Sequence, residues 1–193
     1  YMFISGGMTQ VSESWDAGYT GVGQRIAIVD TGIDTDHQSF SDAGFFLSLR
    51  KHLIDEGLAP NDYDALDLLD QDEISKILPE LNAYQDYYVS SAKSLYVSSK
   101  IPFGYNYIDL STNVTHDYDS QGNHGSHVAG ISAANRFLAD GTDAQENIWV
   151  VGNAPDAQIL VMKVFGANGG AYESDIYAAI EDAITLDADT VNL

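Results

Sequence analysis

The run Arg25-Ile-Ala-Ile-Val-Asp30, followed at once by Thr31-Gly32, decides the fold of this chain. A short apolar run after a glycine-rich turn (Gly21 and Gly23) predicts a buried β-strand. Because Thr-Gly breaks the run, Asp30 is expected at or near the carboxyl end of that strand.

Two further apolar runs and two helical patterns complete the expected core. Residues 158–164 and 189–193 are predicted as strands, and residues 124–135 and 173–186 as helices. In the second helix, apolar residues recur at a spacing of three and four, which is typical of a helix that buries one face. Strands alternating with helices predict a parallel sheet with right-handed crossovers. We therefore expect an α/β three-layer domain, whose ligands bind at the carboxyl ends of the strands, where Asp30 falls.

Residues 45–96 are predicted as a helical insertion within this domain. Six apolar residues fit the spacing of one or two amphipathic helices: Leu66, Leu69, Ile74, Ile77, Leu78 and Leu81. Pro79 predicts a helix start or a kink. Many acidic residues lie between Asp62 and Glu73, which indicates a solvated outer face. We expect the insertion to pack on the sheet and not to form a separate domain.

Composition excludes several classes of function. The chain has 193 residues with 45% hydrophobic content, which is typical of a globular domain. Its net charge of −21 repels phosphate backbones, so nucleic acid is not an expected partner, whereas carboxylates could hold calcium or simply keep the chain soluble. The absence of cysteine excludes disulfides, thiolate metal sites and a cysteine nucleophile. No apolar run approaches the ~18 residues of a membrane helix, and residue 1 begins without a signal-peptide pattern.

Two side chains are candidates for acid–base chemistry. An acid at the end of an apolar strand is costly unless it is paired, so Asp30 either caps a turn or orients a histidine and stabilises its protonated form. His124 begins a predicted helix beside glycine, which leaves its ring uncrowded, so it is either a general base or a surface or capping residue. His127 lies three positions on, but His-x-x-His lacks the spacing and the glutamate of a zinc-protease helix, so no metal ligand is assigned.

Five ordered segments together resemble the subtilisin-like serine peptidases. They are Ile28–Asp34, similar to the Asp signature; Asn123–Gly130, similar to the His signature, with Ser126 where threonine is usual; Gly152–Pro155; Met162–Gly166; and Asp189–Leu193. The stretch 100–107 is similar to the large cell-envelope proteases of Gram-positive bacteria, the lactocepin and C5a-peptidase group. The resemblance implies that residues 1–193 are the N-terminal part of a peptidase domain that is secreted or anchored at the cell surface.

The resemblance also implies roles for individual residues. Asp30 would be the orienting acid and His124 the base of an Asp-His-Ser triad. The Gly-Thr-Ser motif that carries the family's nucleophile does not occur in this sequence, and the oxyanion asparagine lies downstream in the family. We therefore expect a C-terminal fragment of the same protease as partner and a protein or peptide as substrate.

The same resemblance bears on substrate binding and on calcium. The segment Gly166, Ala167, Asn168, Gly169 and Gly170 is similar to the edge that pairs with the substrate backbone, although it could also be a plain flexible loop. No cofactor is required for the chemistry. Subtilases often bind structural calcium, but Ser39 stands where a common aspartate ligand is expected.

Two other functions stay open at this point. A pseudoprotease would use the same fold for binding alone, and an acidic calcium-binding surface module would account for the net charge. Retention of both Asp30 and His124 favours the enzyme.

Overall fold

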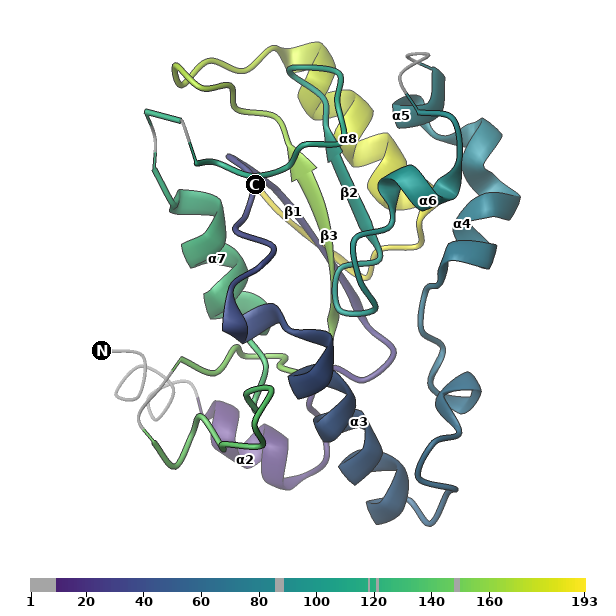
Figure 1. Ribbon diagram of the computed structural model, residues 1–193, viewed down its shortest axis with the longest axis vertical. Helices are drawn as coiled ribbons and strands as arrows, with labels where there is room; N and C mark the ends of the chain where they lie inside the picture. The colour runs from purple at the N-terminus through teal and green to yellow at the C-terminus, as the bar shows by residue number, and fades with distance from the viewer. Residues whose placement is uncertain (1–9, 86–88, 118, 121, 148–149) are drawn as a thin grey trace.

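Four parallel strands form one sheet in the part of the chain that the structure describes (Figure 1). The computed structural model describes residues 10–85, 89–117, 119–120, 122–147 and 150–193. The strands are β1 (Arg25–Asp30), β2 (Phe103–Asn106), β3 (Gln158–Lys163) and β4 (Thr190–Asn192), in the order β2-β3-β1-β4. The predicted α/β parallel-sheet fold is confirmed, and β2 is a strand that the sequence analysis missed.

The register of the sheet aligns the ends of its two central strands. Residue 25 pairs with residue 158, and this register continues along both strands until Asp30 pairs with Lys163. All six residues of each strand are buried, as expected for strands covered on both faces. Thus Asp30 and Lys163 lie side by side at the carboxyl edge, toward which the arrowhead of β3 points at the top of Figure 1.

Alternate residues of β1 enter two separate cores, which makes the domain three-layered. Ala27 and Val29 face a core shared with α8 (Glu173–Thr185), whereas Ile26 and Ile28 face a core shared with α7 (His124–Ala133). Each helix therefore covers one face of the sheet. The predicted helices at 124–135 and 173–186 are present with slightly earlier ends.

Helices and short helical turns fill the segment between β1 and β2. They are η1 (Gln38–Phe40), α3 (Asp42–Asp55), η2 (Tyr63–Leu66), α4 (Gln71–Ile77), η3 (Leu78–Glu80), α5 (Asn82–Gln85) and α6 (Ala92–Leu95); α2 (Val11–Asp16) precedes β1. The start of α3 at Asp42 precedes the expected insertion boundary, because Ser41 caps that helix by accepting a hydrogen bond from Gly44 N. Pro79 lies in the first turn of η3, directly after α4.

One part of the segment between β1 and β2 contributes to the α8-side core, and another part forms a separate apolar cluster outside it. Ile74, Leu81 and Leu95 are fully buried in the α8-side core, together with Val29 of β1. By contrast, α3 and η2 form a smaller cluster of their own around Phe45, Leu49, Leu53 and Leu66. The expectation that residues 45–96 form an insertion is thus compatible with a segment that supplies part of one core.

A buried carboxylate joins α8 to this segment and to β2. Asp182 accepts hydrogen bonds from Asn82 N (2.6 Å), Ala83 N (3.0 Å) and the Tyr107 hydroxyl (2.8 Å). Burial raises its pKa above the usual value for aspartate, against the opposing effect of these donors. Asp182 therefore fixes the start of α5 and the end of β2 on α8.

No helix in the described ranges is both long and apolar enough to cross a membrane.

Candidate active site

The carboxylate of Asp30 is buried at the end of β1. Its side chain is 7% exposed, and Oδ1 accepts a hydrogen bond of 2.6 Å from the backbone N–H of Thr31. The carbonyl of Asp30 accepts from Val164 N at 3.0 Å, which holds the turn after β1 against the end of β3. A buried carboxylate needs such partners, because desolvation otherwise disfavours its charge.

His124 supplies the second partner of this carboxylate. It is the first residue of α7, and its Nδ1 lies 2.9 Å from Oδ1 and 3.0 Å from Oδ2 of Asp30. These are hydrogen-bond distances, so the two residues meet across 94 positions of sequence as their motifs led us to expect. The His124 side chain is 65% exposed. With Nδ1 turned to Asp30, Nε2 lies at the opposite edge of the ring and can take up or give a proton there.

Two glycines allow α7 to approach the end of β1 closely enough for this contact. The backbone N–H of Gly125 donates to Thr31 Oγ1 at 3.0 Å. A β-carbon on Gly125 would lie 2.2 Å from Gly32 O and 3.2 Å from Asp30 Oδ1, so only glycine fits. Gly32 has a φ of +92°, which favours glycine as well. Gly130, on the same helix, has no neighbour within 4 Å of such a β-carbon.

The far end of α7 is held by the stretch Gly152–Ala154. The N–H groups of Gly152, Asn153 and Ala154 donate to the carbonyls of Ala134, Ile131 and Ser132, each at 2.9 Å. These carbonyls belong to or follow the last turn, where a helix leaves its acceptors without partners. The segment Gly152–Pro155, the third of the five that resemble the family, therefore caps the helix that carries His124.

A histidine without any recognisable motif also contacts α7. His116 Nε2 lies 2.6 Å from Ser126 Oγ, and this oxygen also accepts a hydrogen bond of 2.8 Å from Asp34 N. The hydroxyl at position 126 thus joins the loop after β1 to the loop before α7. Threonine, usual at this position in the family, would supply the same hydroxyl.

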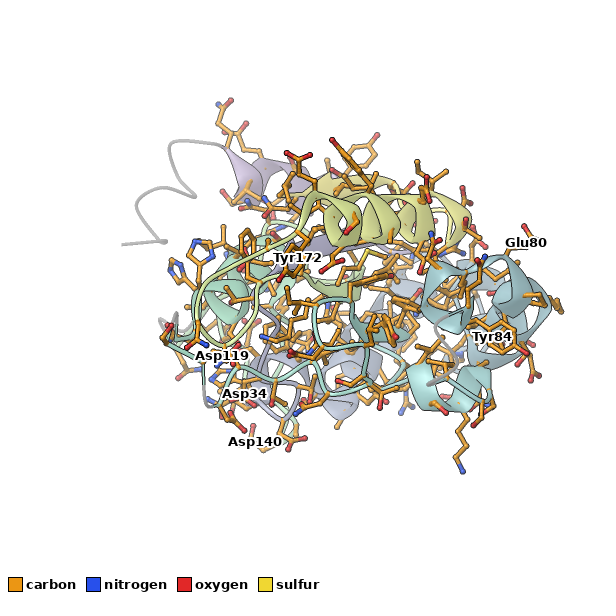
Figure 2. The ribbon with its side chains drawn as sticks, turned by 90° about the horizontal axis from the view of Figure 1, so that it is seen from above. Asp34, Glu80, Tyr84, Asp119, Asp140 and Tyr172 are labelled. Atoms are coloured by element: carbon orange, nitrogen blue, oxygen red, sulfur yellow. The ribbon has the colours of Figure 1, made fainter. Side chains whose placement is uncertain are left out.

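Lys163 is a buried cation at the same edge of the sheet. Its side chain is 2% exposed, and Nζ donates to Thr31 O at 2.5 Å and to the carboxylate of Asp119. Figure 2 labels Asp119 and Asp34 on the side of the molecule that lies away from Glu80 and Tyr84. Sequence reasoning missed this pair, since Asp119 lies in a loop without a motif; a lysine inside an otherwise apolar strand is the signal that could have revealed it.

The five residues proposed to bind substrate follow β3 at this edge. Gly166, Ala167, Asn168, Gly169 and Gly170 form a turn in which Gly166 N donates to Gly170 O and Gly169 N to Gly166 O, each at 2.9 Å. Ala167 O accepts from Ser120 N at 2.7 Å, so the turn is tied to the loop before α7. Residues 167–170 are exposed. The segment shares the edge of the sheet with Asp30.

Two acidic residues near the Asp motif, Asp34 and Asp42, accept hydrogen bonds from backbone N–H groups. Asp34 Oδ1 accepts from Asp36 N, and the carboxylate of Asp42 accepts from Ser99 N and Lys100 N. Within the ranges that the structure describes, no group of three or more His, Asp or Glu side chains is placed to hold a metal ion.

Comparisons with known proteins give the family of this chain. Residues 21–193 match the subtilase family. The chain is 30% identical to a PII-type proteinase of Lacticaseibacillus paracasei and to a PI-type proteinase of Lactococcus lactis subsp. cremoris, over 96% of this chain in both cases. It is 28% identical to the minor extracellular protease Vpr of Bacillus subtilis over 94% of this chain.

This chain spans only 8% of the length of the first two relatives and 15% of the third. The family match nevertheless covers most of the sequence, including β1, α7 and all that follows. The family match, the parallel sheet between two helical layers and the contact of Asp30 with His124 lead to one conclusion: the chain belongs to the subtilase family.

Proposed function

We propose that this chain supplies the acid and the base of a serine endopeptidase. The observation that carries the proposal is the contact of the buried Asp30 carboxylate with Nδ1 of His124, at 2.9 Å. In this role Asp30 holds the imidazole in the tautomer that carries the Nδ1 proton and stabilises the imidazolium. His124 Nε2 then takes the proton of a serine hydroxyl and later returns it to the leaving amine of the peptide.

The nucleophilic serine belongs, in this proposal, to a segment outside this sequence, either downstream in the same chain or on a C-terminal fragment that associates with it. Residues 1–193 are then the N-terminal part of the peptidase domain, and residues 45–96 are an insertion in it. The chemistry uses side chains alone and requires no cofactor, so calcium would have a structural role. The name of the relative Vpr supports an extracellular or cell-surface location.

The segment 166–170, of which residues 167–170 are exposed, is proposed to bind the substrate backbone. It lies beyond the carboxyl end of β3, where the chain has left the sheet and its own backbone could pair with an extended peptide. Binding through main-chain hydrogen bonds places little demand on substrate side chains, which suits a protease acting on many proteins.

A serine-directed fluorophosphonate tests the proposal on the complete protease. The wild type should be labelled on a serine outside residues 1–193, and His124→Ala should lose the labelling because no base activates the hydroxyl. His127→Ala is the matched control, since His127 is exposed on the same helix one turn away and should label normally. A folded wild type that neither labels nor cleaves peptides would favour a pseudoprotease and contradict the proposal.

A further inference from the structure

Lys163 is an unusual residue to find where it lies. It is a nearly fully buried ammonium at the end of a central strand, paired in register with the proposed catalytic acid Asp30. Burying a cation is costly unless it is paired and hydrogen-bonded. Both partners are present, namely the Asp119 carboxylate and the Thr31 carbonyl oxygen.

Three segments that build the candidate site meet at this cation. Thr31 belongs to the turn after β1, and its hydroxyl accepts from Gly125 N on the helix that carries His124. Asp119 belongs to the loop before that helix. The next residue of this loop, Ser120, donates to Ala167 O of the proposed substrate segment. Lys163 thus links the turn after Asp30, the helix α7 that carries His124 and the proposed substrate-binding segment 166–170.

The close packing around the lysine leaves this arrangement little freedom. A β-carbon on Gly32 would lie 3.1 Å from Cδ of Lys163 and 2.2 Å from Val114 O. The aliphatic part of Lys163 therefore supports the turn that follows Asp30, while its ammonium holds the carbonyl of Thr31. A shift of this side chain would move the turn and, through Gly125, the start of α7.

We propose that Lys163 is a positioning residue for the reaction and that Asp119 serves to neutralise it beside Asp30. The inference rests on the proposed function, since it assigns Lys163 a role in holding Asp30 and His124. In the wild type the charges of Lys163 and Asp119 offset each other, so the imidazolium of His124 interacts mainly with Asp30.

Removing the charge of Lys163 and removing the charge of Asp119 should have opposite effects on the stability of the protonated ring of His124. Without the Asp119 charge, the remaining cation disfavours the protonated ring of His124; without Lys163, the remaining anion favours it. Other titratable groups on the elements packed around this corner include Asp34 and Asp36 after β1, Asp109 after β2, His116 and Asp117 in the loop before α7, and His127 on α7. These groups are the same in every variant compared, so they do not change the direction of either effect.

The test measures kcat and KM of the complete protease on a peptide substrate across the acidic pH range. Asp119→Asn should move the acidic midpoint of the kcat/KM profile to lower pH, and Lys163→Met should move it to higher pH. Each shift should be roughly 0.3–0.5 pH unit, because the exposed ring of His124 is partly screened by solvent. In both variants kcat should fall roughly tenfold to a hundredfold with a smaller change in KM, since misplacement of the reacting groups mainly affects the chemical step.

The double variant and a surface pair separate this role from a structural one. Lys163→Met combined with Asp119→Asn should return the midpoint to its wild-type position while kcat stays low. Lys51 and Asp55 form an exposed ion pair on α3, so Lys51→Met and Asp55→Asn should change neither quantity. If Lys163→Met fails to fold, the direction in which Asp119→Asn moves the acidic midpoint of the kcat/KM profile tests the inference by itself.

Midpoints that stay in place, or that move in the same direction in both single variants, would overturn the inference. An inactive wild type that no fluorophosphonate labels would instead refute the proposed function. The two failures are therefore distinguishable.

Discussion

Replacing Lys100 with methionine should abolish a rise in folding stability between roughly pH 7 and pH 9. Lys100 is fully buried just before β2, where its ammonium donates to Pro155 O at 2.8 Å and to Ala157 O at 2.6 Å. Nζ also lies 4.8 Å from the centroid of the Phe45 ring. No carboxylate within the described residues is placed to form an ion pair with it at contact distance.

This environment disfavours the charged form. Burial lowers the pKa of Lys100 from 10.5 to about 7, and the charges of Asp156 and Asp42 oppose that shift only in part. In the unfolded chain the lysine keeps its ordinary pKa. Between the two values the unfolded state binds more protons than the folded state, so stability rises as the pH rises. Below pH 7 both states are protonated and the cost of burying the charge is fully present.

The size of the effect follows from the two pKa values. Integrating the proton-binding difference from pH 7 to pH 9 yields a gain of about 2 kcal/mol in the free energy of unfolding. Lys100→Met removes the titrating group, so the wild type should gain about that much relative to the variant over this interval. Other groups that titrate in the same range cancel in the comparison.

Urea denaturation of the complete peptidase domain and of the variant at several pH values measures this difference. Lys51→Met, at an exposed position on α3, is the control and should show a difference from wild type that does not depend on pH. A flat difference for Lys100→Met as well would refute the reasoning, because Lys100 would then remain protonated in the folded protein at pH 9.

Two other changes have consequences that the structure makes specific. Asp182→Asn puts an amide N–H₂ group against hydrogen-bond donors whose bonds the carboxylate accepts in the wild type. It should therefore lower the free energy of unfolding, measured by urea denaturation, by roughly 2–4 kcal/mol. An unchanged free energy would contradict the role of Asp182 in joining α8 to α5 and β2. Gly125→Ala should destabilise the domain and abolish peptide cleavage, because the new β-carbon would clash with Gly32 O. Gly130→Ala, on the same helix but without a close neighbour, should raise the thermal midpoint of unfolding, because alanine is favoured over glycine in a helix by about 1 kcal/mol. Equal effects of the two variants would show that α7 does not pack closely against the turn after β1.

The meeting of Asp30 and His124 was predictable because both residues lie in segments that resemble the Asp and His signatures of the family. The apolar run of β1 ends at Asp30, and the glycine after His124 marks a helix that must pack closely. In parallel sheets the functional groups gather at the carboxyl ends of strands. Proximity across a long stretch of sequence therefore followed from two short motifs.

The parts that escaped prediction depend on tertiary contacts. The strand Phe103–Asn106 is four residues long and contains a glycine, so its pairing with β3 leaves no periodic signal in the sequence. The partner of Lys163 is a loop aspartate whose position depends on how the chain returns to the sheet. By contrast, α3 carries Phe45, Leu49 and Leu53 at a regular spacing of four after the cap Ser41, a signal that was available to sequence reasoning.

The division of the core by the sheet has a consequence for how such proteins can be remodelled. The part of the β1–β2 segment from Leu69 to Leu95 packs on the α8 face, whereas Phe40 and Ile101, near the two ends of that segment, pack on the opposite face, where α7 carries His124. The outer part of that segment, from Leu49 of α3 to Leu66 of η2, has an apolar cluster of its own, whereas the start of α3 is tied to the stretch after α7, where Asn135 Nδ2 donates to Ser41 O at 2.8 Å. Evolution or an engineer could therefore lengthen, shorten or redecorate this outer part to suit a new environment while the acid and the base keep their mutual distance.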